Sequence, residues 1–277
     1  MDNNCIRLKY SGVGALDLDR TFDCGQCFRF YKDGDSWKGV SRGRMLTFTA
    51  VSDGEIEVRG CDEETARHFL ALDDDYDAFD REILSVLDGK ALEYMTGACR
   101  VGHGIRILRQ DPFETLCSFI LSQNNNIPRI KKLVEALCMN FGESFTDEAT
   151  GEVYYSFPTP KALYDAGVDR IFELKTGFRA KYLYDAAEAV LDGRIDLDAL
   201  YDMPTADAVT QLCRIKGVGV KVASCTVLFG FGKLDVFPVD VWIKRALDED
   251  FGEGFDHTVF GRYAGIAQQY IYYCKRF

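Results

Sequence analysis

The segment 212–230, LCRIKGVGVKVASCTVLFG, constrains the fold of this chain more than any other. Apolar residues at helical spacing lie on both sides of Gly217-Val218-Gly219, which predicts two helices joined by a tight turn that needs both glycines. The second helix begins at once, and the N–H groups of its first turn can bind a phosphate. The segment therefore predicts a helical hairpin, although the pattern alone is equally typical of a hairpin without a ligand.

Lys221 lies in the first turn of the second predicted helix, among Val220, Val222 and Ala223. The helix dipole disfavours a positive charge at this position, and apolar neighbours disfavour it as well. Both effects favour the neutral amine, which is a nucleophile. The alternative is an exposed lysine that binds a phosphate.

Asp240 follows Pro238 and Val239 in the segment FPVDVWIKRAL, where we expect a helix to begin. Aspartate is a common N-cap, so a structural role is the default interpretation of this residue alone. A carboxylate near a nucleophile can instead stabilise positive charge that develops on a substrate.

The rest of the chain predicts an α+β fold. From Asp62 onward the apolar period is helical, and after Gly104 helices and loops follow almost without interruption. We therefore expect an N-terminal domain at 1–104, with an antiparallel β-sheet and helices, and an all-α domain at 105–277. Within the first domain, four short β-rich runs separated by turn residues predict an antiparallel meander: 26–32, 36–42, 44–51 and 55–60.

The charge of the chain is unevenly distributed. A net charge of −11 argues against binding to nucleic acid. Residues 211–247, however, carry six Lys and Arg against two acids, and residues 100–132 carry the same numbers. A positive face on an acidic body can bind phosphates while limiting non-specific adhesion. Chance clustering of solvated charges is the alternative.

Other classes of protein find little support. No segment approaches the roughly 20 consecutive apolar residues of a membrane span, and the N-terminus lacks the pattern of a secretory signal. The ten cysteines are scattered, which favours reduced thiols in a cytosolic compartment. Cys24 and Cys27 form a CxxC pair with no second pair nearby, so we expect no metal site.

Together, the hairpin, Lys221 and Asp240 resemble the helix-hairpin-helix GPD superfamily of DNA glycosylases. The lysine is typical of the bifunctional members, and the monofunctional alkylated-base glycosylases lack it. The resemblance implies a helix-hairpin-helix glycosylase fold for the domain at 105–277.

Four further segments resemble the 8-oxoguanine DNA glycosylases in particular, so that the likeness covers the chain from about residue 10 to its end. They are CGQCFRF (24–30), QDPFETLCSFILSQNNNIPRI (110–130), TGFRAKY (176–182) and YAGIAQQYIYY (263–273). The resemblance implies that the Gly25 carbonyl accepts the hydrogen on N7 of the lesion and that Gln268 binds the base edge. It also implies that Cys225 and Tyr272 stack on the two faces of the base, and Pro238 completes the implied substrate-binding set.

The resemblance also implies a set of contacts with DNA. A glycosylase must take the base out of the stack, and Asn and Arg side chains can pair with the base left opposite. The implied residues are Asn124, which fills the space of the extruded base, Arg129 and Arg179, which contact the opposite cytosine, Phe178, a wedge, and Gly217 and Gly219 at the hairpin.

Three residues depart from the pattern of this family. Trp242 stands where His is usual two residues after the catalytic aspartate, and Tyr272 stands where Phe is usual. Lys216 stands where Pro often precedes the glycines, so it is a second candidate amine.

The expected function is excision of 8-oxoguanine from double-stranded DNA, opposite cytosine, through a lysine Schiff base and with β-elimination at the abasic site. Another lesion, such as an alkylated purine, or non-catalytic DNA binding are the alternatives. No metal, redox cofactor or iron–sulfur cluster is implied, although the resemblance allows a monovalent cation held by hairpin carbonyls. We expect a monomer with no membrane partner, in the cytoplasm or nucleoid of a prokaryote (favoured) or in a eukaryotic nucleus.

Overall fold

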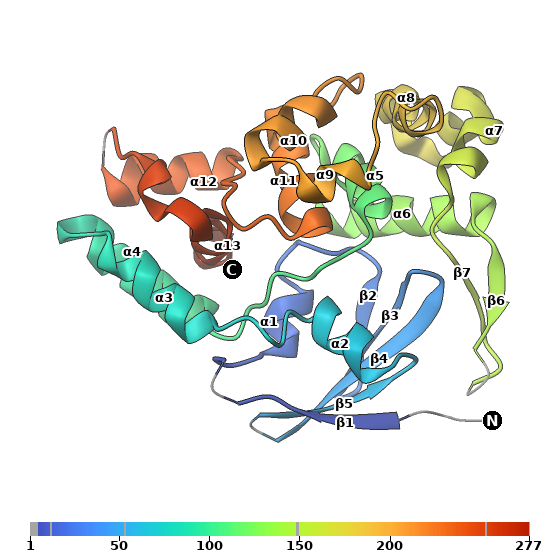
Figure 1. Ribbon diagram of the computed structural model, residues 1–277. Helices are drawn as coiled ribbons and strands as arrows, with labels where there is room; N and C mark the ends of the chain where they lie inside the picture. The colour runs from blue at the N-terminus through green and yellow to red at the C-terminus, as the bar shows by residue number, and fades with distance from the viewer. Residues whose placement is uncertain (1–4, 12, 53, 148–149, 253, 277) are drawn as a thin grey trace.

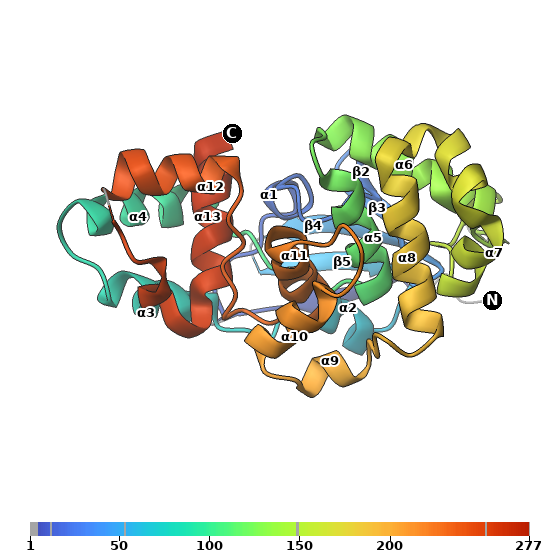
Figure 2. The same ribbon diagram turned by 90° about the horizontal axis from the view of Figure 1, so that it is seen from above.

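The computed structural model describes residues 5–11, 13–52, 54–147, 150–252 and 254–276. One antiparallel sheet lies beneath two groups of helices (Figures 1 and 2). The predicted α+β class is confirmed. None of the helices in these described ranges is long and apolar enough to cross a membrane.

The sheet has the strand order β1-β5-β4-β3-β2. Its strands are β1 (Cys5–Lys9), β2 (Phe30–Asp33), β3 (Ser36–Ser41), β4 (Arg44–Ser52) and β5 (Glu55–Arg59). The four predicted strands are therefore confirmed, but β2 begins four residues later than expected because residues 26–29 form a loop. β1 was not predicted; it adds to the sheet beside β5, far from it in the sequence.

One face of the sheet is buried because its side chains alternate between core and solvent. In β5, for example, Ile56 and Val58 are buried and the residues on either side are more exposed. Helices α1 (Leu18–Phe22) and α2 (Glu63–Phe69) cover this face. The ring of Phe22 stacks on those of Phe30 and Trp37, with centroids 4.6 and 5.4 Å apart, and closes the smaller core.

The helices form the larger core. They are α3 (Tyr76–Ser85), α4 (Gly89–Gly102), α5 (Pro112–Ser122), α6 (Ile127–Phe141), α7 (Pro160–Ile171), α8 (Ala180–Leu191), α9 (Ala199–Asp202), α10 (Thr205–Leu212), α11 (Val220–Phe231), α12 (Val241–Ala246) and α13 (Ala264–Arg276). In Figure 2, α3, α4, α12 and α13 lie to one side and α5 to α8 to the other. Helices α3 and α4 precede the predicted boundary at residue 104, but their side chains belong to this larger core. A small hairpin, β6 (Ser144–Thr146) and β7 (Val153–Tyr155), follows α6.

A buried arginine ties the two cores together where the chain passes between them. The Arg106 side chain is fully buried and donates hydrogen bonds to the carbonyls of Val13, Gly14, Ala15, Ala71 and Asp74. A buried guanidinium is costly unless its donors are satisfied. Five carbonyls meet that need and hold residues 13–15 and 71–74 against the start of the helical body.

Candidate active site

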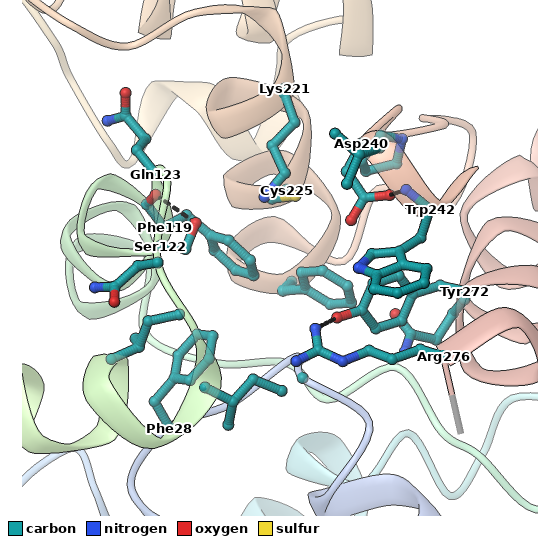
Figure 3. A pocket seen from close by; sticks show the side chains of 18 of the residues that line it. Phe28, Phe119, Ser122, Gln123, Lys221, Cys225, Asp240, Trp242, Tyr272 and Arg276 are labelled. Atoms are coloured by element: carbon teal, nitrogen blue, oxygen red, sulfur yellow. Dashed lines mark hydrogen bonds between the residues drawn. The ribbon is translucent and has the colours of Figure 1, made fainter. Parts of the chain in front are cut away.

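A cavity of about 460 Å³ lies where the two groups of helices meet the loop before β2 (Figure 3). Its walls come from α5, α11, α12 and α13 and from the segments 25–28 and 122–127. The sequence-predicted residues that line it are Gly25, Asn124, Lys221, Cys225, Pro238, Asp240, Gln268 and Tyr272. Segments far apart in the chain therefore contribute to one site.

The predicted hairpin is present, as α10, a short turn and α11. Gly217 has φ of +78°, and a Cβ atom there would lie 2.4 Å from the ring of Tyr182, so only glycine fits. The expectation that the turn needs both glycines is wrong for Gly219. Its φ of −95° is one that any residue adopts, and a Cβ there would meet open space. Gly219 is exposed as the N-cap of α11, where its small size leaves the helix terminus accessible.

Lys221 lies in the first turn of α11, as predicted, and its side chain enters the cavity. The ammonium nitrogen lies over the ring of Phe119, 5.2 Å from its centroid, so the amine faces an aromatic wall of the cavity. Lys216, the other candidate amine, is exposed in the turn and does not line the cavity. The geometry therefore favours Lys221 as the nucleophile.

Asp240 is the N-cap of α12, as predicted, and it also lines the cavity. Its Oδ1 accepts hydrogen bonds of 2.9 Å from the backbone N–H groups of Trp242 and Ile243. These bonds fix the orientation of the carboxylate. The structural and the chemical interpretation of Asp240 are thus compatible, because capping with one oxygen leaves the carboxylate facing the cavity (Figure 3).

The thiol of Cys225 lies near both charged groups, one turn after Lys221 on α11. Burial raises the pKa of this thiol, whereas Lys221 lowers it and Asp240 raises it by smaller amounts. The side chain is 5% exposed and remains a neutral thiol, a polarizable surface suited to packing against a base.

The loop that carries Gly25 is held on both sides. The Gln26 side chain donates to the carbonyls of Thr21 and Arg106, each at 2.8 Å, and accepts from the N–H of Leu108. On the other side, Gln269 donates to the Cys24 carbonyl at 3.0 Å. Gly25 itself has φ of +80°, a conformation that favours glycine. Its backbone is therefore fixed at the wall of the cavity.

Two residues of α13 complete this wall. Gln268 is 5% exposed, and its Oε1 has no hydrogen-bond partner within the described ranges of the chain. A buried, unpaired acceptor that lines a cavity is suited to a ligand that donates. Tyr272, one turn later, lies beside Gly25, and burial raises its pKa to about 12, so its hydroxyl is neutral near pH 7.

Asn124 lies at the rim, at the end of α5, and its φ of +47° is one that asparagine tolerates. Hydrogen bonds from the Arg179 side chain support this turn. It is 4% exposed, and its guanidinium donates to the carbonyls of Gln123 and Asn124, the latter at 3.1 Å. Arg179 thus positions the rim, and the cytosine contact implied for it stays a prediction.

Arg129 and Phe178 lie on the surface beside this rim. Arg129, in the first turn of α6, is exposed, and Phe178 is 51% exposed. The guanidinium of Arg179 lies 4.5 Å from the Phe178 ring centroid. An exposed arginine and an exposed aromatic ring next to the cavity could contact a base and its neighbour in a duplex.

Sequence reasoning missed several cavity residues. Phe28 and Phe119 are apolar walls, and Arg276 is a third charged group in the lining. Arg276 lies four residues after Tyr272, so the two side chains share one face of the helix. This spacing was the signal that could have placed Arg276 at the site.

Comparisons with known protein families cover nearly the whole chain. A family model described as 8-oxoguanine DNA glycosylase, N-terminal domain, matches residues 11–116. A model described as HhH-GPD superfamily base excision DNA repair protein matches residues 117–258.

Individual proteins give the same result. N-glycosylase/DNA lyase OGG1 of Arabidopsis thaliana is 32% identical over 93% of this chain and 76% of its own. The N-glycosylase/DNA lyase of Saccharomyces cerevisiae is 39% identical over 53% of this chain, and the alignment spans 42% of the yeast protein. Among solved structures, the 8-oxoguanine glycosylase/lyase of Clostridium acetobutylicum, bound to duplex DNA with cytosine opposite 8-oxoguanine, has a TM-score of 0.87 at 30% identity and covers 100% of this chain and 99% of its own.

Proposed function

The chain belongs to the 8-oxoguanine DNA glycosylases of the helix-hairpin-helix GPD superfamily, and from this membership we propose that it excises 8-oxoguanine from duplex DNA and cleaves the strand at the abasic site. The observation that carries the proposal is the shared cavity: Lys221 and Asp240 enter it beside Gly25, Gln268 and Tyr272. Non-catalytic DNA binding would require neither the lysine nor the aspartate inside a cavity.

The chemistry proposed for the pair is a displacement at the sugar. The neutral amine of Lys221 attacks C1′ while the bond from C1′ to N9 breaks, and the electron pair leaves with the base, which then takes up a proton. The carboxylate of Asp240 stabilises the positive charge that develops on the deoxyribose. Nζ, now bonded to C1′, loses a proton. Its lone pair then forms the C=N bond as the C1′–O4′ bond breaks, and O4′ takes up a proton, which leaves an open sugar with a protonated Schiff base.

The Schiff base then allows strand cleavage. Loss of a proton from C2′ to water sends electrons to the iminium nitrogen and gives an enamine. The enamine electrons then form a C2′–C3′ double bond and expel the 3′ phosphate, which is β-elimination. Water finally hydrolyses the imine and releases Lys221. The chain's own residues supply the nucleophile and the charge stabilisation for this sequence.

We propose that the wall formed by Gly25 and Gln268 recognises the lesion. The lesion carries a hydrogen on N7, where guanine has a lone pair, and the Gly25 carbonyl would accept from the lesion and repel guanine. Gln268, whose buried Oε1 has no hydrogen-bond partner in the described part of the chain, would bind the Watson–Crick edge that both bases share. Arg129 and Arg179 are proposed to contact the cytosine opposite, and the protein is proposed to act as a monomer.

A monovalent cation at the hairpin is a separate proposal. The described part of the chain contains no group of three or more His, Cys, Asp or Glu side chains placed to hold a metal ion. A cation would therefore be held by backbone carbonyls of the turn 213–219. The Ile215 carbonyl accepts a bond from Val218 there and retains a second lone pair. Such an ion would brace the turn on the DNA side.

The direct test uses duplexes with a single 8-oxoguanine opposite cytosine, a single alkylated purine, or undamaged guanine. We expect release of free 8-oxoguanine and cleavage of its strand, with no reaction at guanine. Preferential release of the alkylated base would replace the proposed lesion, and tight binding without release of any base would contradict the enzymatic function.

A further inference from the structure

Arg276, in the last turn of α13, contributes the third charged side chain to the cavity lining, after Lys221 and Asp240. The proposed chemistry uses the lysine and the aspartate and leaves the arginine without a role. In Figure 3 the guanidinium extends from α13 into the lower part of the cavity, below Trp242.

Tyr272 holds this guanidinium in place. Nη1 of Arg276 donates a hydrogen bond to the Tyr272 hydroxyl, one helical turn earlier. The charged group also lies 5.5 Å from the centroid of the tyrosine ring. A phenylalanine at position 272 would lack the hydroxyl that accepts this bond, so the tyrosine and the arginine act as a pair.

The pair lies on the Gly25 side of the cavity. A Cβ atom on Gly25 would be 3.3 Å from the Tyr272 hydroxyl oxygen, to which Arg276 is bonded. The N–H groups of the arginine are therefore close to the backbone proposed to accept from N7 of the lesion. In 8-oxoguanine the atom next to N7 is C8, which carries a carbonyl oxygen; in guanine C8 carries only hydrogen.

We propose that Arg276, positioned by the Tyr272 hydroxyl, donates a hydrogen bond to the C8 carbonyl oxygen of the flipped lesion. This inference rests on the proposed function and deepens it. A guanidinium presents five N–H groups in a planar fork, so it can donate to several acceptors at once. The lesion edge would then meet an acceptor at N7 and a donor at O8, and guanine would satisfy neither.

The test compares Arg276→Met with Lys275→Met. Lys275→Met is the matched control because it removes the same charge from the same helical turn. The Lys275 ammonium, however, pairs with Glu249 and Asp250, at 2.9 and 2.7 Å, and does not line the cavity. Three measurements are made: single-turnover excision of 8-oxoguanine, cleavage of a preformed abasic site, and binding to duplexes with 8-oxoguanine or guanine on a 2′-fluoro sugar that resists cleavage.

We expect Arg276→Met to lower lesion excision by about 10- to 100-fold, the loss of one charge-assisted hydrogen bond. The binding preference for 8-oxoguanine over guanine should fall by a similar factor, while cleavage of the abasic site, which has no base, changes by less than about twofold. Tyr272→Phe should show a smaller loss of the same pattern, and Lys275→Met should behave as wild type.

Two results would overturn the inference. Equal losses on 8-oxoguanine, guanine and abasic duplexes would assign Arg276 to a DNA phosphate. Unchanged excision by Arg276→Met would remove any contact with the base. In both of these results the wild-type protein still releases 8-oxoguanine. Failure of the proposed function is a different result, because the wild-type protein itself would then not release 8-oxoguanine, and the inference would fail together with the proposed function.

Discussion

A Cβ atom added to Gly25 would lie 3.3 Å from the hydroxyl oxygen of Tyr272, closer than most side-chain contacts in folded proteins. The φ of Gly25, +80°, is also one that L side chains rarely adopt. Gly25→Ala should therefore shift the loop away from the cavity and lower excision of 8-oxoguanine by about tenfold or more, since one buried contact contributes roughly 1–3 kcal/mol. Single-turnover excision on matched lesion and guanine duplexes measures the effect.

Gly34→Ala is the control for this substitution. Gly34 also has a positive φ, +59°, but it lies in the β2–β3 turn with no atom within 4 Å of an added Cβ. The variant should lose some stability and keep its excision rate. If Gly25→Ala excises the lesion as fast as Gly34→Ala does, the N-terminal loop does not recognise N7.

Lys221→Gln should abolish covalent trapping of 8-oxoguanine DNA by borohydride, because an amide nitrogen cannot form the Schiff base. DNA binding should remain largely intact. Lys216→Gln, which changes an exposed lysine of the same hairpin, should trap as wild type does. Loss of trapping in Lys216→Gln with retention in Lys221→Gln would reverse the assignment of the nucleophile.

Arg129→Gln should reduce the preference for cytosine opposite the lesion, because an exposed arginine can donate two hydrogen bonds to a base edge. Excision rates against the four opposite bases measure this preference. Uniform losses against all four would indicate a phosphate contact instead.

Arg179→Gln should behave differently from Arg129→Gln. The Arg179 guanidinium is buried and bonded to the Gln123 and Asn124 carbonyls, and its loss leaves these acceptors unpaired. We expect the free energy of unfolding to fall by about 1–3 kcal/mol, together with slower excision. Denaturant unfolding gives the first quantity, and a stability equal to that of wild type would contradict the positioning role.

Glu114 predicts a dependence of stability on pH. It is mostly buried, and burial raises its pKa from 4.5 to about 7, although Arg29 lies 3.8 Å away and opposes the shift. Because the folded protein holds this proton more tightly than the unfolded chain, stability should fall as pH rises from about 5 to about 7. Glu114→Gln should lose less stability over this range. Its free energy of unfolding, compared with that of wild type, should therefore rise by about 1–3 kcal/mol between pH 5 and pH 8.

Urea unfolding at the two pH values tests the Glu114 prediction, and the difference between variant and wild type cancels the other titrating groups. Glu93→Gln, an exposed change on α4, should keep the wild-type pH profile. A profile of Glu114→Gln that parallels wild type would show that another group causes the fall.

Local signals predicted much of this molecule. The Asp240 N-cap and the position of Lys221 in the first turn of α11 follow from interactions within a few residues, and both are confirmed. The strands β3, β4 and β5 could also be predicted from local sequence, because short turns such as Asp33-Gly34-Asp35 join neighbouring strands and set their register.

The elements that were missed depend on distant partners. β1 has five residues and becomes a strand by pairing with β5, and β6 and β7 have three residues each, too few for a period to show. The place of Arg276 depends on how α13 packs against the Gly25 loop. The need for glycine at 217 and not at 219 depends on the ring of Tyr182, which the sequence does not place.

The loop around Gly25 alternates between the two cores: Cys24 and Phe28 pack into the larger one, and Cys27 and Phe30 into the smaller. The backbone proposed to accept from N7 is thus anchored in both cores, whereas Lys221 and Asp240 stand at the N-terminal ends of two helices of the larger one. A change in the packing of the smaller core can therefore move the Gly25 carbonyl relative to the amine and the carboxylate without altering either of them.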